Sequence, residues 1–190
     1  MKKYYLILTS IVLVIFTSCS SSKKVAETTA TGETREEFVA PCADFNENTT
    51  DAFRATASAT SPNLQFARDK AMGLARNALA QKIEVSINGA FDNFANQYDV
   101  GNEEEFKDVT KNITAQVIDQ MLSGINVVCE KYYTLSSGKY EVWVGIEMPV
   151  DNVGRSIYDQ VSNEEKIRLD YEYEKFKEEM IKEIERRKAQ

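Results

Sequence analysis

The chain has 190 residues, 43% of them hydrophobic and 28% charged, a composition typical of one soluble globular domain with additional terminal segments. Its formal net charge is −7 and no segment concentrates Lys and Arg, which argues against a nucleic-acid partner. The absence of histidine excludes Ser-His-Asp and Cys-His catalysis as well as zinc sites that contain histidine.

Residues 1–18 are typical of a bacterial lipoprotein signal peptide. Two lysines precede an apolar run, Tyr4–Phe16, whose 13 residues are too few to cross a bilayer as a helix. The run ends in FTSC, which resembles the lipobox of bacterial lipoproteins, although Phe16 replaces the usual leucine. The resemblance implies cleavage before Cys19 and attachment of acyl chains to it. The alternative is an ordinary secretory signal with an incidental cysteine.

Residues 19–40 are predicted to be a flexible tether between the lipid and the folded domain, because they are rich in Ser, Thr, Glu, Lys and Ala. By resemblance to lipoprotein sorting rules, Ser20 favours the outer membrane. No acidic run follows Cys19, which favours an anchor that faces the periplasm.

A strand followed by a helix is predicted from residue 52 onward. Apolar residues alternate with polar ones from Phe53 to Thr60. Ser61 is the expected N-cap and Pro62 the expected first helical residue. Small and apolar residues then recur at helical spacing from Ala67 to Leu79, so alanines on the strand and on the helix are expected to face each other.

A further strand is predicted near residues 83–88, where Ile83, Val85 and Ile87 alternate with polar residues. Phe91, Phe94 and Tyr98 then continue as strand or as a loop packed on the core. An aromatic cluster of this kind also suits a small ligand, but its spacing favours core or edge packing.

A second helix is expected to begin after its N-cap, Asn102, and to carry an apolar stripe from Phe106 to Met121. The carboxylates of residues 103–105 are interpreted as favourable charges at a helix start and not as metal ligands. A hairpin follows, with strands over 125–135 and 140–148. Its only tryptophan, Trp143, is on the less apolar face, where it either packs under a helix, the favoured interpretation, or forms part of a binding surface.

Residues 151–190 are predicted to form a long, highly charged C-terminal helix, interrupted near Ser162, with one apolar stripe. An isolated helix of this kind is marginal in water, so part of it must lie on the domain or on a partner. The candidate interaction surface therefore consists of Trp143, Tyr173, Phe176 and Met180.

A disulfide between Cys42 and Cys129 is predicted. If Cys19 is acylated, these are the two thiols that remain, and the mature chain lies in an oxidising compartment. The alternative is a pair of buried free cysteines.

Four features together resemble a known envelope family: the lipobox, the strand FRATASAT, the helix ARDKAMGLARNALAQKI, and the hairpin LSGINVV…GKYEVWVGIEMP. They are similar to the Lpp-twenty type of outer-membrane lipoprotein, whose domain resembles the amino-terminal domain of flagellar-ring assembly proteins. The match covers roughly residues 50–150. It implies a small α+β domain without established enzymatic activity.

The expected fold is α+β, with a small antiparallel or mixed sheet of about four strands, two helices on one face, and the long C-terminal helix. The domain is expected to span residues 41–150. We expect a non-enzymatic lipoprotein without cofactor, metal or catalytic residues, anchored in the outer membrane through its lipid and binding a protein partner. The alternative is a periplasmic lipoprotein that binds a small ligand.

Overall fold

A computed structural model of the chain describes residues 27–28, 34–35, 38–97, 100–162 and 173–188. The chain divides into two compact units, residues 1–39 and residues 40–190. In the described part of the first unit, the two-residue strands β1 (Glu27–Thr28) and β2 (Thr34–Arg35) pair antiparallel. Cys19 lies outside the described residues.

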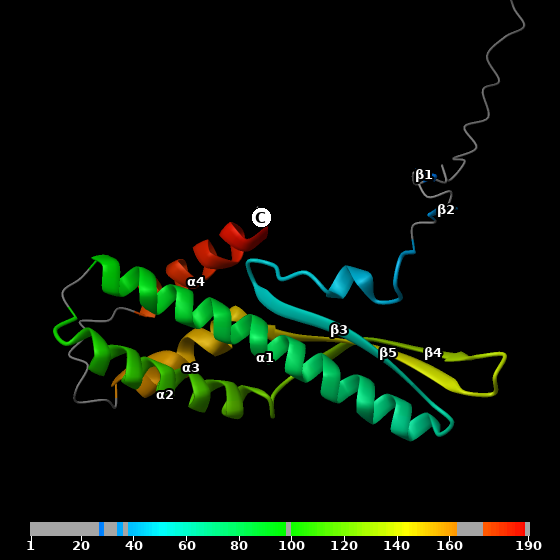
Figure 1. Cartoon of the computed structure of the whole chain (residues 1–190). Coiled ribbons are helices and arrows are strands. Elements are labelled where there is room, and N and C mark those ends of the chain that lie inside the picture. Colours follow the sequence, from blue (N-terminus) through cyan, green and yellow to red (C-terminus); the bar gives the residue numbers. More distant parts are fainter. Residues whose placement is uncertain (1–26, 29–33, 36–37, 98–99, 163–172, 189–190) are drawn as a thin grey trace, which may run out of the picture. The chain divides into compact units, whose positions relative to one another are not determined.

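The second unit is an α+β fold with one three-stranded antiparallel sheet in the order β3-β5-β4 (Figure 1). Its elements in chain order are the 3-10 helix η1 (Ala43–Phe45), β3 (Ala52–Ser61), α1 (Leu64–Gln97), α2 (Glu103–Met121), β4 (Asn126–Thr134), β5 (Tyr140–Pro149), α3 (Val150–Ser162) and α4 (Tyr173–Lys188). The predicted α+β class is confirmed. The prediction of about four strands is wrong, since the described sheet of this unit has three.

The turn between β3 and α1 is capped by Asn63 and not by the predicted Ser61. The side-chain oxygen of Asn63 accepts a hydrogen bond from the backbone N–H of Phe66 (3.0 Å), and its carbonyl oxygen accepts one from Ala67 (3.0 Å). Ser61 still belongs to β3. Because Pro62 favours an extended backbone at the residue before it, the strand continues through Ser61 and the helix begins after the proline.

The strand predicted near residues 83–88 is wrong, because these residues continue α1. Ile83 and Ile87 are four positions apart, so they lie on one helix face, and both are buried, as are Ala90 and Phe91. Val85 is 39% exposed. The apolar residues of this segment therefore match the helical period once its later residues are included, although the first three also match the period of a strand.

Small residues bring the first half of α1 close to the sheet. Ala67, Ala71 and Ala75 are fully buried on α1, which lies across β3 and β5 (Figure 1). Paired positions of the two strands supply the other side of this core: Phe53, Ala55, Ala57, Ala59, Val142, Val144, Ile146 and Met148. The alanine faces thus permit the short helix-to-sheet separation that bulky residues on both sides would prevent.

The second helix begins where the sequence predicted. The side-chain oxygen of Asn102 accepts hydrogen bonds from the backbone N–H groups of Glu104 (3.0 Å) and Glu105 (3.1 Å). Phe106 and Val117 are buried on the face of α2 that belongs to the core. The polar start and the apolar stripe together make α2 locally predictable.

The described C-terminal residues, 150–162 and 173–188, form two helices that pack on the rest of the unit, and α4 is not a long helix. Met180 and Ile184 of α4 are buried in the same core as α1 and the sheet. On the surface, Lys177 of α4 forms an ion pair with Asp151 of α3 at 2.8 Å. The compact unit accordingly extends to Gln190, beyond the predicted domain limit at residue 150.

Gly89 of α1 lies against the buried carboxylate of Glu183, which belongs to α4. The side chain of Glu183 has 0% exposure, and a Cβ atom added at Gly89 would lie 2.8 Å from its Cδ. Arg186 and Arg187 bind the Glu183 carboxylate at 2.8 and 2.7 Å. The hydrogen bond from Arg186, opposed by burial and reinforced by Arg187, holds the pKa of Glu183 below its ordinary value.

Candidate functional site

The face of the sheet opposite α1 is polar and aromatic. Because side chains alternate along a strand, every second residue of each strand lies on this face. Strand pairing arranges them in rows across β3, β5 and β4, of which two are Ser58–Trp143–Lys131 and Thr60–Glu141–Tyr133. A further row joins Thr56, Gly145 and Cys129.

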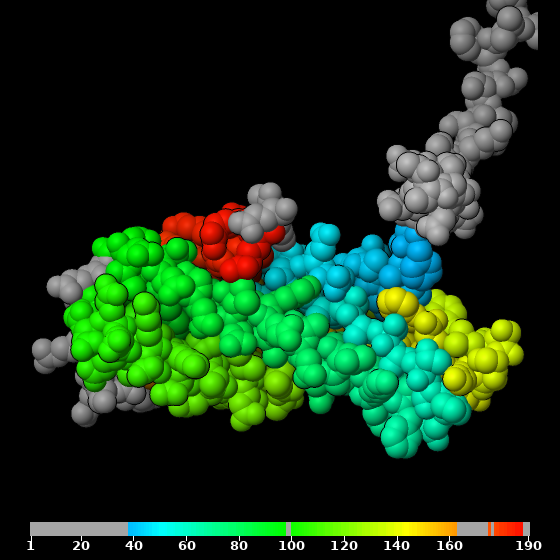
Figure 2. Space-filling view, viewed as in Figure 1, coloured from blue at the N-terminus to red at the C-terminus, as the bar shows by residue number. Residues whose placement is uncertain are grey.

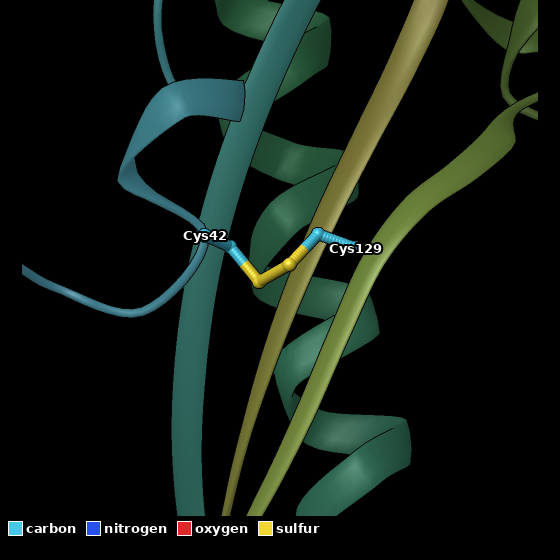
Figure 3. The surroundings of a disulfide bond; sticks show 2 residues. All are labelled: Cys42 and Cys129. Atoms are coloured by element: carbon cyan, nitrogen blue, oxygen red, sulfur yellow. A yellow bond between two sulfur atoms is a disulfide. The ribbon is translucent and has the colours of Figure 1, made fainter.

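One end of this face is covered by the segment that precedes β3. Cys42 and Cys129, which the sequence analysis paired, form a disulfide with a Cα–Cα distance of 5.9 Å (Figure 3). The bridge lies on the sheet face away from α1 and fastens the segment to β4 (Figure 3). The two cysteines are therefore brought together by chain segments that are 87 residues apart.

Phe45 extends this cover over the centre of the sheet. A Cβ atom added at Gly145 would lie 3.1 Å from the Cβ atoms of both Phe45 and Cys129, so the close approach favours a residue without a side chain. The guanidinium of Arg54 lies 5.7 Å from the Phe45 ring centroid and also binds the Glu147 carboxylate at 3.1 Å. This end of the face is thus filled by chain 40–48.

The other end of the face remains accessible, and we name it the Trp143 face: Ser58, Thr60, Lys131, Tyr133, Glu141 and Trp143. Trp143 is partly exposed with its indole Nε1 buried, and Tyr133 is 44% exposed. Lys131 and Glu141 place opposite charges beside the aromatic rings. Since α1 lies on the opposite face, the favoured expectation that Trp143 packs under a helix is not met by α1.

Sequence reasoning identified Trp143 but missed its neighbours. Lys131 and Tyr133 lie on the same face of the hairpin as Trp143. The turn at residues 136–138 sets the strand register and therefore could have predicted this arrangement. Ser58 and Thr60 had no such signal, because β3 ends at Ser61 and β5 begins only at Tyr140, with 78 residues between them.

The α4 residues of the predicted interaction surface do not join this face. Met180 is fully buried, so its assignment to an interaction surface is wrong; its side chain completes the core beneath α4. Tyr173 and Phe176 lie in α4, and their side chains are outside the described part of the structure.

The aromatic residues considered for a small ligand mainly join α1 to α2. Phe91 is 2% exposed and lies edge-on to Phe106, with ring centroids 6.2 Å apart, while Phe94 stacks on the same ring at 6.5 Å. A cavity of about 280 Å³ adjoins them, lined by polar residues such as Asp92 and Lys107. Tyr98 lies outside the described residues.

Lys82 has a structural role at the edge of β3, where it joins this strand to the preceding segment. Its ammonium donates hydrogen bonds to the backbone carbonyls of Asn46 and Arg54, the latter at 2.8 Å. Burial lowers the pKa of Lys82, an effect that Glu47 partly opposes. Asn46 and Asn48 accept hydrogen bonds from the backbone N–H groups of residues 56 (3.2 Å) and 54 (2.9 Å). These contacts close the outer edge of β3.

Within the described ranges, no cluster of three or more potential metal-binding side chains occurs. None of the helices placed by the structure combines the length and apolar character that crossing a membrane requires. Comparison with known proteins adds no family assignment: no protein-family model, curated protein or solved structure matches the chain.

Proposed function

We propose that the protein is a non-enzymatic envelope lipoprotein that acts as a membrane-tethered protein-binding or assembly module in the periplasm. The lipobox-like sequence ending at Cys19 and the resemblance to Lpp-twenty lipoproteins support the membrane anchor and its placement in the outer membrane. The observation that carries the binding role is the Trp143 face. It is an accessible aromatic surface on the side of the sheet that α1 leaves free.

The chemistry of the Trp143 face suits a protein partner. Tyrosine and tryptophan are enriched at protein interfaces, because they supply large contact areas while their polar atoms remain able to form hydrogen bonds. Lys131 and Glu141 supply charges of both signs at the rim of the aromatic pair, where they favour a partner with the complementary arrangement. A tether would keep such a module near the membrane while leaving it free to reorient.

A protein partner fits better than a small ligand. Small-molecule sites are concave and usually enclose about 300–1,000 Å³. The aromatic residues that a small ligand would require, Phe91 and Phe94, pack against Phe106 between α1 and α2. The Trp143 face is instead an extended surface of a sheet, a geometry typical of contacts between proteins.

Site-specific photocrosslinking in intact cells tests this proposal. A photoreactive residue at Thr60, an exposed position of the Trp143 face, should give an adduct of defined mass with another protein. The matched control is Arg76, which is exposed on α1. Adding Trp143→Ala should reduce the Thr60 adduct several-fold. Equal adducts at both positions, or no adduct at Thr60, would contradict the proposed surface.

A further inference from the structure

The two outer edges of the sheet differ in how their backbone groups are used. At the β3 edge, Asn46, Asn48 and Lys82 occupy backbone hydrogen-bonding groups of Arg54 and Thr56. At the β4 edge, by contrast, the described residues supply no such side chains to the backbone. An exposed edge strand is a template for pairing with another strand unless it is covered or its geometry prevents pairing.

The turn shows which backbone groups of β4 point outward. The N–H of Leu135 donates to the carbonyl of Lys139 (2.8 Å), and the N–H of Gly138 donates to Leu135 (2.9 Å), with Gly138 at a φ of +77°. This arrangement is a three-residue loop with a bulge, which makes Leu135 and Lys139 a hydrogen-bonded pair. Alternation along the ladder then directs the backbone groups of Glu130, Tyr132 and Thr134 away from β5.

We infer that β4 pairs antiparallel with β4 of a second copy of this chain, with Tyr132 on the twofold axis. In this register, Lys131 lies opposite Tyr133 of the other copy, and Glu130 lies opposite Thr134. The outward-pointing residues therefore face one another, as a ladder requires. The two sheets join into one six-stranded antiparallel sheet, and their α1 helices lie on the same face of it.

Charge favours this register over its neighbours. Centring the pair on Lys131 or on Glu130 places like charges directly opposite each other, an arrangement that is destabilising. Centring it on Tyr133 leaves few paired residues, because β4 ends at Thr134. The register centred on Tyr132 avoids both problems and places an ammonium beside a tyrosine ring at each end. This self-complementarity argues for a second copy as the occupant.

The surroundings of the β4 edge leave room for the second strand. α1 packs on β3 and β5, and on the helix side of β4 the side chains of Val127 and Tyr132 are 46% and 48% exposed. The Glu130 carboxylate forms an ion pair with Arg68 at 3.0 Å and accepts a hydrogen bond from the Tyr132 hydroxyl at 3.0 Å. In the space-filling view, the hairpin of β4 and β5 (yellow) protrudes beside the start of α1 (Figure 2). The dimer would also place two Trp143 faces side by side.

Cysteine crosslinking of the full chain in intact cells tests the register. Tyr132→Cys should form a disulfide-linked homodimer under a mild oxidant, because directly opposite hydrogen-bonded residues have Cα atoms about 5.5 Å apart. Lys131→Cys and Tyr133→Cys should each fail to self-link, since diagonal positions are about 7–8 Å apart. Co-expressed, these two variants should link to each other. Phe66→Cys, at a position 73% exposed on α1, is the control for random collision.

The pattern of products decides the inference. Self-linking at Tyr132→Cys together with mixed linking of Lys131→Cys to Tyr133→Cys, both well above the Phe66→Cys level, supports the dimer. The mixed linking of Lys131→Cys to Tyr133→Cys is measured in chains that keep Tyr132. The inference can therefore be tested even if Tyr132→Cys fails to fold. Linking no greater than in the control, or equal self-linking at all three β4 positions, would overturn it. Capture of a different protein at Tyr132→Cys would overturn it as well.

Discussion

Gly89 of α1 lies against the buried side chain of Glu183 of α4, so a side chain at residue 89 would require Glu183 or α4 to move. A methyl group at Gly89 would lie within 3.0 Å of three atoms of Glu183, whose side chain is buried and bound by two arginines. Gly73, in the same helix, has no atom within 4 Å of the position of an added Cβ. The two glycines are therefore a matched pair.

Gly89→Ala should destabilise the protein by about 1–3 kcal/mol, because the buried side chain has to move or α4 has to shift. Gly73→Ala should stabilise it by about 0.5–1 kcal/mol, since alanine loses less backbone entropy in a helix. Urea unfolding of the two variants and the wild type measures both effects. Equal stabilisation by both substitutions would mean that Glu183 does not occupy the space above Gly89.

The same carboxylate predicts a pH dependence. Because the pKa of Glu183 is lower in the folded protein than its ordinary value of 4.5, its contribution to stability is present above about pH 4.5 and is lost as the pH falls through the lower folded value. Glu183→Gln should therefore be less stable than wild type at neutral pH, and the difference should shrink in acid.

Urea unfolding at pH 7 and at successively lower pH values measures this difference. Glu185→Gln, at an exposed position of the same helix, is the control and should behave like wild type. A Glu183→Gln difference that stays constant from neutral pH into acid would contradict a charged, arginine-bound Glu183 in the folded state.

At the scale of elements, local patterns predicted some boundaries and long-range packing changed others. The cap at Asn102, the apolar stripe of α2 and the alternating strand from Phe53 were readable, because each depends on neighbouring residues. The second half of α1 was not, since Ile83, Val85 and Ile87 alternate with polar residues as in a strand, and the helical period is visible only when the later residues are included. The apolar stripe of α4 indicated that part of the helix is buried, but not which surface covers it, because that depends on Gly89 and on the apolar groups beneath Met180.

The candidate site shows the same division. Trp143 could be assigned to the less apolar face of its strand from alternation alone. The turn at residues 136–138 sets the register that places Lys131 and Tyr133 on the same face, although the sequence analysis did not make this link. The pairing of β3 with β5 could not be predicted, because nothing local specifies which distant strand completes an edge. The part of this face that stays accessible is set by how far residues 40–48 extend over the sheet.

Reduction of the Cys42–Cys129 disulfide should weaken the attachment of the segment before β3. The bridge closes a loop with a sequence separation of 87 residues, for which the chain-entropy model gives an upper figure of roughly 4–5 kcal/mol. Urea unfolding with and without reductant should show a lower midpoint for the reduced protein.

A variant with both Cys42→Ser and Cys129→Ser should reproduce the reduced protein and no longer respond to reductant. Identical unfolding midpoints for oxidised and reduced wild-type protein, with the bridge verified by intact mass, would contradict a stabilising role.

In the whole molecule, the proposed anchor and the proposed binding surface belong to different units. The first unit carries the lipobox-like sequence, and the second carries the sheet with its Trp143 face. The Cys42–Cys129 bridge lies close to the start of the second unit at Ala40, so force transmitted along the chain from the anchor would reach β4 through a covalent bond. In the proposed function, this connection would let the module stay folded while its tether is under tension.

Attachment of the folded binding module to the membrane by lipid can be measured at Cys19. Detergent phase partitioning compares the wild-type protein with Cys19→Ala, both expressed in a Gram-negative host and supplied with labelled palmitate. The wild-type protein should enter the detergent phase and carry the label, because several acyl chains give stable membrane attachment. Cys19→Ala should stay unlabelled and unprocessed at the lipoprotein cleavage site. Identical processing, partitioning and labelling of the two proteins would show that Cys19 does not carry a lipid anchor.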